Sequence, residues 1–237
     1  MENGAKFSVL DHGYVQLIES WGSDEAIIEA ARMSVDKGFV SWEPYEGHSR
    51  GDLGLLSHLW NNKHTSPFEM AGLIIEVKAP IFVFREWHRH RTQSYNEMST
   101  RYVPLPDENY VPFVSHVVAR GNAVSANKQA QGAGKLEELD ATEWTWELRK
   151  LYEHAQAVYE YGIKIGIPKE LARLVVPVGR YSRMRASANL LNWLKFLQLR
   201  DHAAAQWEIR EYAKTVGGMI AARFPRTFQL FNEGRLT

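Results

Sequence analysis

Hydrophobic residues along the chain are spaced as in helices in some segments and as in strands in others. The sequence shows no internal repeat. Apolar residues that recur every three to four positions predict helices, while short β-branched or alternating runs predict strands. The predicted helices are 14–21, 23–35, 52–62, 81–89, 136–162, 169–175, 189–199, 206–224 and a last one from 225 to about 231. The predicted strands are 6–10, 73–77, 111–118 and 178–186. We therefore expect a single α+β domain over residues 1–237, richer in helix than in strand.

Several predicted elements have recognisable ends. Ser23 is typical of a helix N-cap, and Asp24 in the following turn favours a helix N-terminus. Pro80 stands where the first residue of a helix is expected. Ser66 precedes Pro67, which favours an extended or turn conformation at Ser66.

The predicted helix 136–162 carries an apolar stripe that is typical of a core-facing surface. The stripe consists of Leu139, Trp144, Leu148, Leu151, Tyr152, Ala155, Val158 and Tyr159. Because such stripes usually pack in a core, we expect no cofactor role for them. The preceding segment, 119–134, is small and polar and is predicted to be a surface loop. Residues 131–135 resemble a phosphate loop only superficially, since they lack the full spacing and the Ser or Thr after the Lys.

Composition excludes several classes of protein. The chain has 28 Lys and Arg and 28 Asp and Glu, so no global field draws in nucleic acid or a membrane surface. It has no Cys, which excludes disulfides, thiolate metal sites and cysteine nucleophiles. The first residues lack the layout of a signal peptide, and no apolar run approaches the roughly 20 residues of a membrane span. We expect a cytoplasmic protein.

The local exception to the balanced charge is the stretch from Arg85 to Arg101. It contains four Arg against two Glu, a local excess of +2. Arg89, His90 and Arg91 are consecutive, so they point in different directions, which suits a ligand site better than a solvated helix face. Arginine suits planar contacts with phosphate or an acidic heterocycle. On charge alone, an Arg-rich helix end followed by a polar loop is an equal alternative.

The same stretch carries a spaced motif. Arg89-His90-Arg91 is followed by seven residues and then by Ser99, within the sequence Ser94-x-Asn96-Glu97-x-Ser99-x-Arg101-Tyr102. This arrangement resembles the signature of the flavin-dependent thymidylate synthases. A motif with so many fixed positions is far more specific than a single glycine box, and it favours the binding site over the polar loop.

Two further patches resemble the same family, so that the resemblance spans roughly residues 9–231. The first is His64-x-Ser66-Pro67-Phe68-Glu69, although Met70 stands where the family commonly has histidine. The second consists of Glu170-Leu171-Ala172-Arg173, Pro177, Asn189, Leu199-Arg200 and Gln206-Trp207-Glu208-Ile209. Lys195, His202 and Ala204 depart from the family pattern in this half of the chain.

The resemblance implies a fold, an assembly and a reaction. The fold is a central antiparallel sheet with several helices, assembled as a homotetramer whose active sites form where subunits meet. The reaction is the reductive methylation of dUMP to dTMP, with methylenetetrahydrofolate as the one-carbon donor and FAD, reduced by NADPH, as the hydride carrier. Unrelated thymidylate synthases attack the uracil ring with a cysteine, which this chain lacks.

The resemblance also assigns residues to ligands. The implied dUMP contacts are Glu86, Trp87, His88, Arg89, Glu97, Met98, Ser99, Thr100, Arg101, Arg173 and Arg200, some of them from a neighbouring subunit. The implied FAD contacts are His64, Ser66, Arg89, His90, Arg91, Glu97 and Asn189. Glu86 departs from the usual glutamine, and a carboxylate repels a phosphate. No metal ligands and no Rossmann glycine fingerprint are expected.

Arg200 and Ser99 are the candidates for the chemistry. A guanidinium beside uracil N3 and its carbonyl would stabilise an ionised ring, which is a better carbon nucleophile. Ser99 is the candidate for a covalent nucleophile, but the sequence shows no adjacent base and orienting group, so we assign it substrate contact.

Two other functions stay open at this point. Metal-dependent hydrolysis would use His88, His90 and Glu97, but two His residues at i and i+2 on a helix do not share a face. An RNA-binding module would use the basic stretch with Tyr95 and Tyr102, but balanced charge and the absence of RNA motifs argue against it.

Overall fold

A five-stranded antiparallel sheet forms the centre of the computed structural model, which describes residues 1–104, 106–120 and 136–235. The strands, in spatial order, are β1 (Lys6–Val9), β2 (Gly13–Trp21), β3 (Gly72–Pro80), β5 (Tyr181–Asn189) and β4 (Ser94–Glu97). Every neighbouring pair is antiparallel. This confirms the antiparallel sheet that the family resemblance implied.

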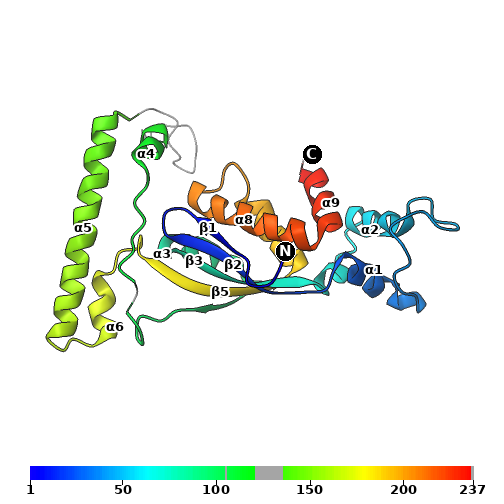
Figure 1. Cartoon of the computed structure of the whole chain (residues 1–237), viewed down its shortest axis with the longest axis horizontal. Coiled ribbons are helices and arrows are strands. Elements are labelled where there is room, and N and C mark those ends of the chain that lie inside the picture. Colours follow the sequence, from blue (N-terminus) through cyan, green and yellow to red (C-terminus); the bar gives the residue numbers. More distant parts are fainter. Residues whose placement is uncertain (105, 121–135, 236–237) are drawn as a thin grey trace.

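Helices cover one face of the sheet and extend beyond both of its ends (Figure 1). The helices are α1 (Asp24–Arg32), α2 (Gly51–Asn61), α3 (Ile81–Trp87), α4 (Val114–Arg120), α5 (Glu138–Lys164), α6 (Lys169–Ala172), α7 (Leu190–Arg200), α8 (Trp207–Arg223) and α9 (Pro225–Arg235). Short 3-10 turns are η1 (Met33–Val35), η2 (Ser66–Glu69) and η3 (Arg173–Val175). The predicted helix-rich α+β class is confirmed.

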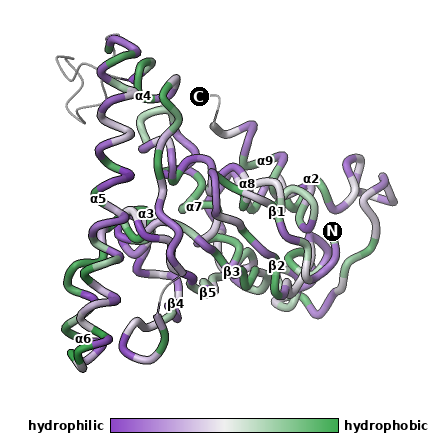
Figure 2. Tube along the Cα trace, turned by 60° about the vertical axis from the view of Figure 1, so that its left-hand side comes forward, coloured by the Kyte–Doolittle hydropathy of each residue, from purple (hydrophilic) through white to green (hydrophobic). Residues whose placement is uncertain are grey.

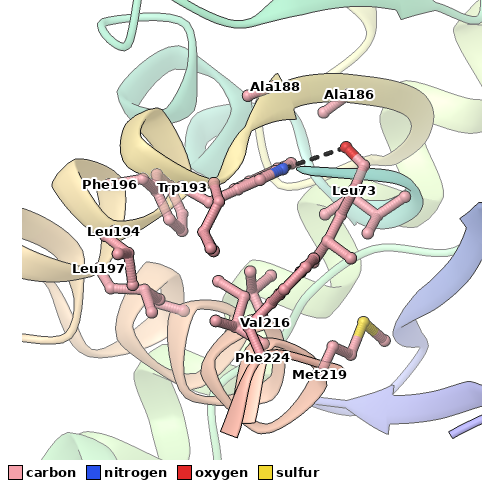
Figure 3. Close-up of a cluster of buried hydrophobic side chains, with 14 of the residues drawn as sticks. Leu73, Ala186, Ala188, Trp193, Leu194, Phe196, Leu197, Val216, Met219 and Phe224 are labelled. Atoms are coloured by element: carbon pink, nitrogen blue, oxygen red, sulfur yellow. Dashed lines mark hydrogen bonds between the residues drawn. The ribbon is translucent and has the colours of Figure 1, made fainter. Parts of the chain in front are cut away.

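The core lies between the inner face of the sheet and helices α7 and α8. Along β3, Leu73, Ile75 and Val77 are fully buried, and the residues between them face outward and are half-buried. Trp193 of α7 packs on this layer, and its Nε1 donates to the carbonyl oxygen of Leu73 at 3.1 Å (Figure 3). Burial of a large aromatic with its polar atom paired fixes α7 on the sheet.

Two sequence predictions about elements are wrong, and one strand was missed. Residues 14–21 form strand β2 and not a helix, because Val15 and Leu17 alternate with half-buried neighbours and Val15 pairs with Val77 of β3. Residues 111–118 were predicted as a strand, but the segment turns into helix α4, where the His116 ring packs on Trp207 at 4.2 Å. The polar segment 94–97, for which no element was predicted, is edge strand β4.

The apolar stripe of α5 is not core in a single chain, contrary to the prediction. Leu139 is 77% exposed, Trp144 50% and Leu151 59%, while Tyr159 is buried. Helices α5 and α6 stand to one side of the sheet, and both carry apolar stretches along the tube (Figures 1 and 2). Periodicity showed that α5 has an apolar face but not what that face packs against.

Smaller predictions have mixed outcomes. Ser23 caps α1, since its side chain accepts from the amide of Ala26 at 3.2 Å, as predicted. Pro80 is the N-cap of α3 and not its first residue. The predicted loop 119–134 and the phosphate-loop-like residues 131–135 lie mostly or wholly outside the described residues. No described helix has the length and apolarity to cross a membrane, and the cytoplasmic location stays a prediction.

Candidate active site

The turn that joins α3 to β4 is held rigidly by the core. Trp87, the last residue of α3, is fully buried, stacks on Phe196 of α7 at 4.6 Å between ring centroids, and donates from Nε1 to Gln93 at 3.1 Å. The Tyr95 hydroxyl lies 3.0 Å from the carbonyl oxygen of Trp87 and 2.8 Å from that of His90. These contacts fix the backbone of the Arg-His-Arg motif.

Helix α3 presents polar side chains in two directions. Its cavity face consists of Ile81, Phe84, Arg85 and His88, which follow the i, i+3, i+4, i+7 spacing of one helix face and line a cavity of about 610 Å³. Its other side carries Glu86, which contacts Arg200 at the end of α7 together with His90, three residues after the helix ends; we call Glu86 and His90 the cluster face. The motif therefore serves two different places on one chain.

The cavity is formed by α3, by the segment after β4 and by η3. Its remaining lining residues are Glu97, Met98, Ser99, Thr100, Arg173, Leu174, Val176, Val178 and Ser182. Two guanidinium groups and three hydroxyl groups thus surround it, with Glu97 as the lining carboxylate among the described residues. This donor set suits a phosphate attached to a partly apolar group.

The segment after β4 is tied to α6 and η3. Arg173 donates from Nη1 to the Thr100 hydroxyl at 3.1 Å, and Lys169 donates to the carbonyl oxygen of Tyr102 at 2.9 Å. Arg101 lies 3.6 Å from Glu170 in an exposed ion pair. The Ser99 hydroxyl accepts from the amide of Arg101 at 3.3 Å, and within the described residues no side-chain base contacts it. Ser99 is thus placed as a hydrogen-bonding group.

The arginine cluster consists of Arg200, Glu86 and His90. Arg200 donates from Nε to His90 Nε2 at 2.9 Å, from Nη1 to Glu86 Oε2 at 3.0 Å and from Nη2 to the Glu86 carbonyl oxygen at 3.1 Å. Because His90 Nε2 accepts, the imidazole is neutral with its proton on Nδ1. Burial and the Arg200 charge lower the pKa of His90 to about 4. Burial raises the pKa of Glu86, while Arg200 opposes that shift.

A third group of predicted residues lies at the opposite end of α7. Asn189 caps α7 by accepting from the amide of Asn192 at 2.9 Å, and its Nδ2 donates to Glu69 at 3.3 Å. Glu69 belongs to η2, which begins at Ser66, and His64 precedes that turn. With 11 residues, α7 places Asn189 and Arg200 about 16 Å apart along its axis.

Comparisons with known proteins identify the family. Residues 16–226 match the family described as "Thymidylate synthase complementing protein". The chain belongs to this family. Among curated relatives, a flavin-dependent thymidylate synthase of Thermus thermophilus is 38% identical, over 98% of this chain and 80% of the relative. That of Thermosipho melanesiensis is 37% identical, over 95% of this chain and 93% of the relative. The sequence resemblance is therefore confirmed.

Solved structures agree with this result. The UMP/dUMP methylase PolB from Streptomyces cacaoi, bound with 5-Br dUMP, has 32% identity and a TM-score of 0.81, and covers 97% of this chain and 99% of its own. The same enzyme bound with 5-Br UMP has 31% identity and a TM-score of 0.80. The alternative of an RNA-binding module has no support among these relatives.

Within this thymidylate synthase family member, the predicted nucleotide residues divide between two places. His88, Glu97, Met98, Ser99, Thr100 and Arg173 line the cavity, with Arg101 in the same segment. Glu86 and Arg200 lie in the arginine cluster. The Trp87 side chain is in the core, so any nucleotide contact of this residue would have to use its main chain. Arg85 and Ser182 line the cavity without having been predicted; the local charge excess was the available signal for Arg85.

Three of the predicted flavin residues, Arg89, His90 and Arg91, offer donor groups that suit an anion. Arg89 and Arg91 are exposed, and among the described residues neither side chain has a hydrogen-bond or ion-pair partner. They flank His90, which has a free Nδ1–H by the tautomer argument above. Unpaired arginines beside a neutral imidazole fit a dinucleotide that carries a pyrophosphate. Ser66 and Asn189 add a hydroxyl and an amide at the other end of α7.

The metal alternative is not supported by the geometry. The His88 Nε2 lies 3.1 Å from the Met184 sulfur, whereas His90 contacts Arg200. The two imidazoles therefore point to different places. No cluster of three or more candidate metal ligands occurs in residues 1–104, 106–120 and 136–235.

Proposed function

We propose that this protein catalyses the reductive methylation of dUMP to dTMP. In the balanced reaction, methylenetetrahydrofolate, dUMP, NADPH and a proton give dTMP, tetrahydrofolate and NADP⁺. The observation that carries the proposal is the spaced motif that begins with Arg-His-Arg just after α3 and ends at Ser99, which lines a cavity of about 610 Å³, in a chain whose relatives are named flavin-dependent thymidylate synthases. The absence of Cys agrees with this route, because uracil activation cannot use a thiolate here.

The chain's own residues bind and activate the nucleotide. Arg173, with the hydroxyls of Ser99 and Thr100, binds the phosphate in the cavity. Arg200 donates to the uracil ring and stabilises negative charge on N3 and its neighbouring carbonyl, which increases electron density at the ring carbon that takes the methyl group. Ser99 contacts substrate and forms no covalent bond, because within the described residues no side-chain base contacts its hydroxyl.

Arg89, His90 and Arg91 would hold FAD, together with Ser66, His64, Glu97 and Asn189. When bound and reduced by NADPH, FAD supplies the hydride equivalent that turns the one-carbon unit into a methyl group. His90 then contributes as a neutral donor through Nδ1, since burial and Arg200 keep its pKa at about 4. The exposed Arg89 and Arg91 supply the charge for the pyrophosphate.

We further propose a homotetramer in which each site combines the cavity of one copy with the arginine cluster of another. Two features support it. The cavity face and the cluster face of α3 point in different directions, so one chain does not converge them on one ligand. The exposed apolar side chains of α5 need a partner, since Trp144, Trp146 and Leu151 are each at least half exposed.

The test of the activity uses the visible spectrum and the product. The purified protein should show flavin bands that bleach with NADPH, and dUMP should gain one methylene in mass only when methylenetetrahydrofolate is present. The absence of flavin bands after incubation with FAD would overturn the proposal. UMP should be assayed beside dUMP, because the PolB structures contain analogues of both nucleotides.

The test of the assembly is sedimentation velocity with a charged interface variant. Leu151→Asp on α5 should shift the tetramer to smaller species and abolish turnover, because it places a carboxylate in an apolar contact. Glu153→Ala, two residues away and also exposed, is the matched control and should leave the tetramer intact. An active monomer would contradict the shared site.

A further inference from the structure

Each of the three nitrogen atoms of Arg200 donates a hydrogen bond, either to Glu86 of α3 or to His90, three residues after the end of that helix. One N–H of each nitrogen is used, by His90 Nε2, by the Glu86 carboxylate and by the Glu86 carbonyl oxygen. A guanidinium has five N–H groups, so one on each terminal nitrogen stays available to a ligand. The plane of the group and the direction of these two donors are thereby defined.

Glu86 and His90, which hold Arg200, are themselves fixed by contacts with the core. Phe196 lies one helical turn before Arg200 on α7 and stacks on Trp87, and the His90 ring contacts Phe196 edge-on at 4.9 Å. Glu86 is therefore the residue before a fully buried tryptophan, on a helix that cannot rotate without disturbing that stack. Two of the three anchors of Arg200 are side chains, the His90 ring and the Glu86 carboxylate, and substituting Glu86 removes its carboxylate while its carbonyl oxygen stays.

The environment of Glu86 argues against direct phosphate contact. It lies on the cluster face of α3 and not on the cavity face, and its side chain is 27% exposed against 19% for Arg200. With His90 neutral, Glu86 and Arg200 form a cluster without net charge. A carboxylate in this place accepts a hydrogen bond from Arg200, and it would repel a phosphate.

We propose that Glu86 is the positioning residue of Arg200, and that it acts on dUMP only through that guanidinium. The inference rests on the proposed function, in which Arg200 activates the uracil ring. It replaces the direct nucleotide contact that the family resemblance implied for Glu86. It also explains how this chain tolerates a carboxylate where the family usually has glutamine: either side chain offers an oxygen to Nη1 of Arg200.

The test is a double-mutant cycle with the flavin-loaded protein, measuring kcat at saturating dUMP and the dUMP dissociation constant by calorimetry. Glu86→Ala should lower kcat about 10-fold and change dUMP affinity less than about 3-fold, because orientation and not charge is lost. Glu86→Gln should restore kcat, since its amide oxygen still accepts from Arg200. In the Arg200→Ala background, Glu86→Ala should have no further effect.

Each result has one meaning. Multiplying effects in the double variant, or a loss of affinity without a loss of kcat, would show direct contact and overturn the inference. Failure of Glu86→Gln to restore kcat would overturn it too. If Arg200→Ala alone keeps full turnover, the activation role in the proposed function fails instead. Glu211→Ala, which breaks an exposed pair with Lys214 on α8, is the control and should leave both constants unchanged.

Glu86→Leu replaces Glu86→Ala in the cycle if the alanine variant does not fold. Leucine has a similar volume but accepts no hydrogen bond, so the same expectations hold for kcat, affinity and the Arg200→Ala background.

Discussion

The cavity face and the cluster face differ in the groups that they bring together. Among the described residues, the cavity face borders a space lined by two guanidinium groups and three hydroxyls, which suit a phosphate. The cluster face holds Arg200 of α7, whose plane is fixed by three hydrogen bonds, but Arg200 is not among the described residues that line the cavity. One face can bind a nucleotide and the other can activate it.

This difference is the reason for proposing a site shared between chains. Residues 85 and 86 are neighbours in sequence, yet a helix turns by about 100° per residue, so their side chains diverge. Two copies that bring a cavity face against a cluster face would complete the site. The exposed apolar surface of α5 supplies the means for such an assembly.

The strongest test of this difference substitutes a cavity residue in one copy of the chain and an arginine-cluster residue in another copy. Arg173→Ala and Arg200→Ala should each be nearly inactive alone, because one loses the phosphate contact and the other the activating donor. Mixed assemblies, purified with two affinity tags after coexpression, should regain activity on the order of 10–100-fold above either variant. In them, an intact cavity meets an intact arginine cluster.

The control for this experiment is coexpression of two differently tagged copies that both carry Arg200→Ala, which should stay inactive. If the mixed assemblies show only the average of the two variants, the whole site lies within one chain and the comparison fails.

A second test asks whether the charge of Arg200 or its planar shape matters in the arginine cluster. Arg200→Lys keeps the positive charge but replaces the planar guanidinium with a single ammonium. The ammonium has three N–H groups, so it cannot donate to His90, to the Glu86 carboxylate and to the Glu86 carbonyl oxygen and also donate to uracil. We expect kcat at saturating dUMP to fall about 100-fold. Arg210→Lys on α8, outside the cluster, is the matched control. A lysine variant with near-normal kcat would show that charge alone suffices.

The sequence predicted the chemistry of the motif better than its placement. Arg89, His90, Arg91 and Ser99 are local in the chain, so their spacing was visible without a structure. What stayed hidden was which way each side chain points. Trp87 was assigned to the nucleotide by family resemblance, but its ring belongs to the core, stacked on a residue more than a hundred positions away.

The errors in the fold have a similar cause. Residues 14–21 can be read with either period, and only the pairing of Val15 with Val77 decides for a strand. The segment 94–97 has no hydrophobic alternation, because β4 is an edge strand with exposed side chains. It forms because β5 offers an unpaired edge, which is a property of the whole sheet and not of the segment.

A smaller effect tests the cavity face. Ser99→Ala removes one hydroxyl and should weaken dUMP binding by about 10-fold, the lower end for one hydrogen bond to a charged group, while kcat falls less than that. Steady-state kinetics with dUMP measure both constants, and mass spectrometry of quenched reactions tests for a protein–nucleotide adduct. Ser182→Ala, at another wall of the cavity, is the comparison variant. An adduct that Ser99→Ala abolishes while binding persists would make Ser99 a nucleophile.

The smallest effect concerns stability and the cluster face. In the unfolded chain His90 binds a proton with its ordinary pKa of 6.5, but in the folded protein only near 4. Between these values the unfolded state binds more protons, so the free energy of unfolding falls as pH falls through this window. Allowing for screening by solvent, we expect a loss on the order of 1–2 kcal/mol between pH 7 and pH 4.5. His90→Gln keeps an acceptor for Arg200 Nε but does not titrate, so its loss should be smaller by that amount. Urea unfolding of both proteins at equal protein and flavin concentration measures the difference, and parallel pH dependences would mean that burial and Arg200 do not hold His90 neutral in the folded protein.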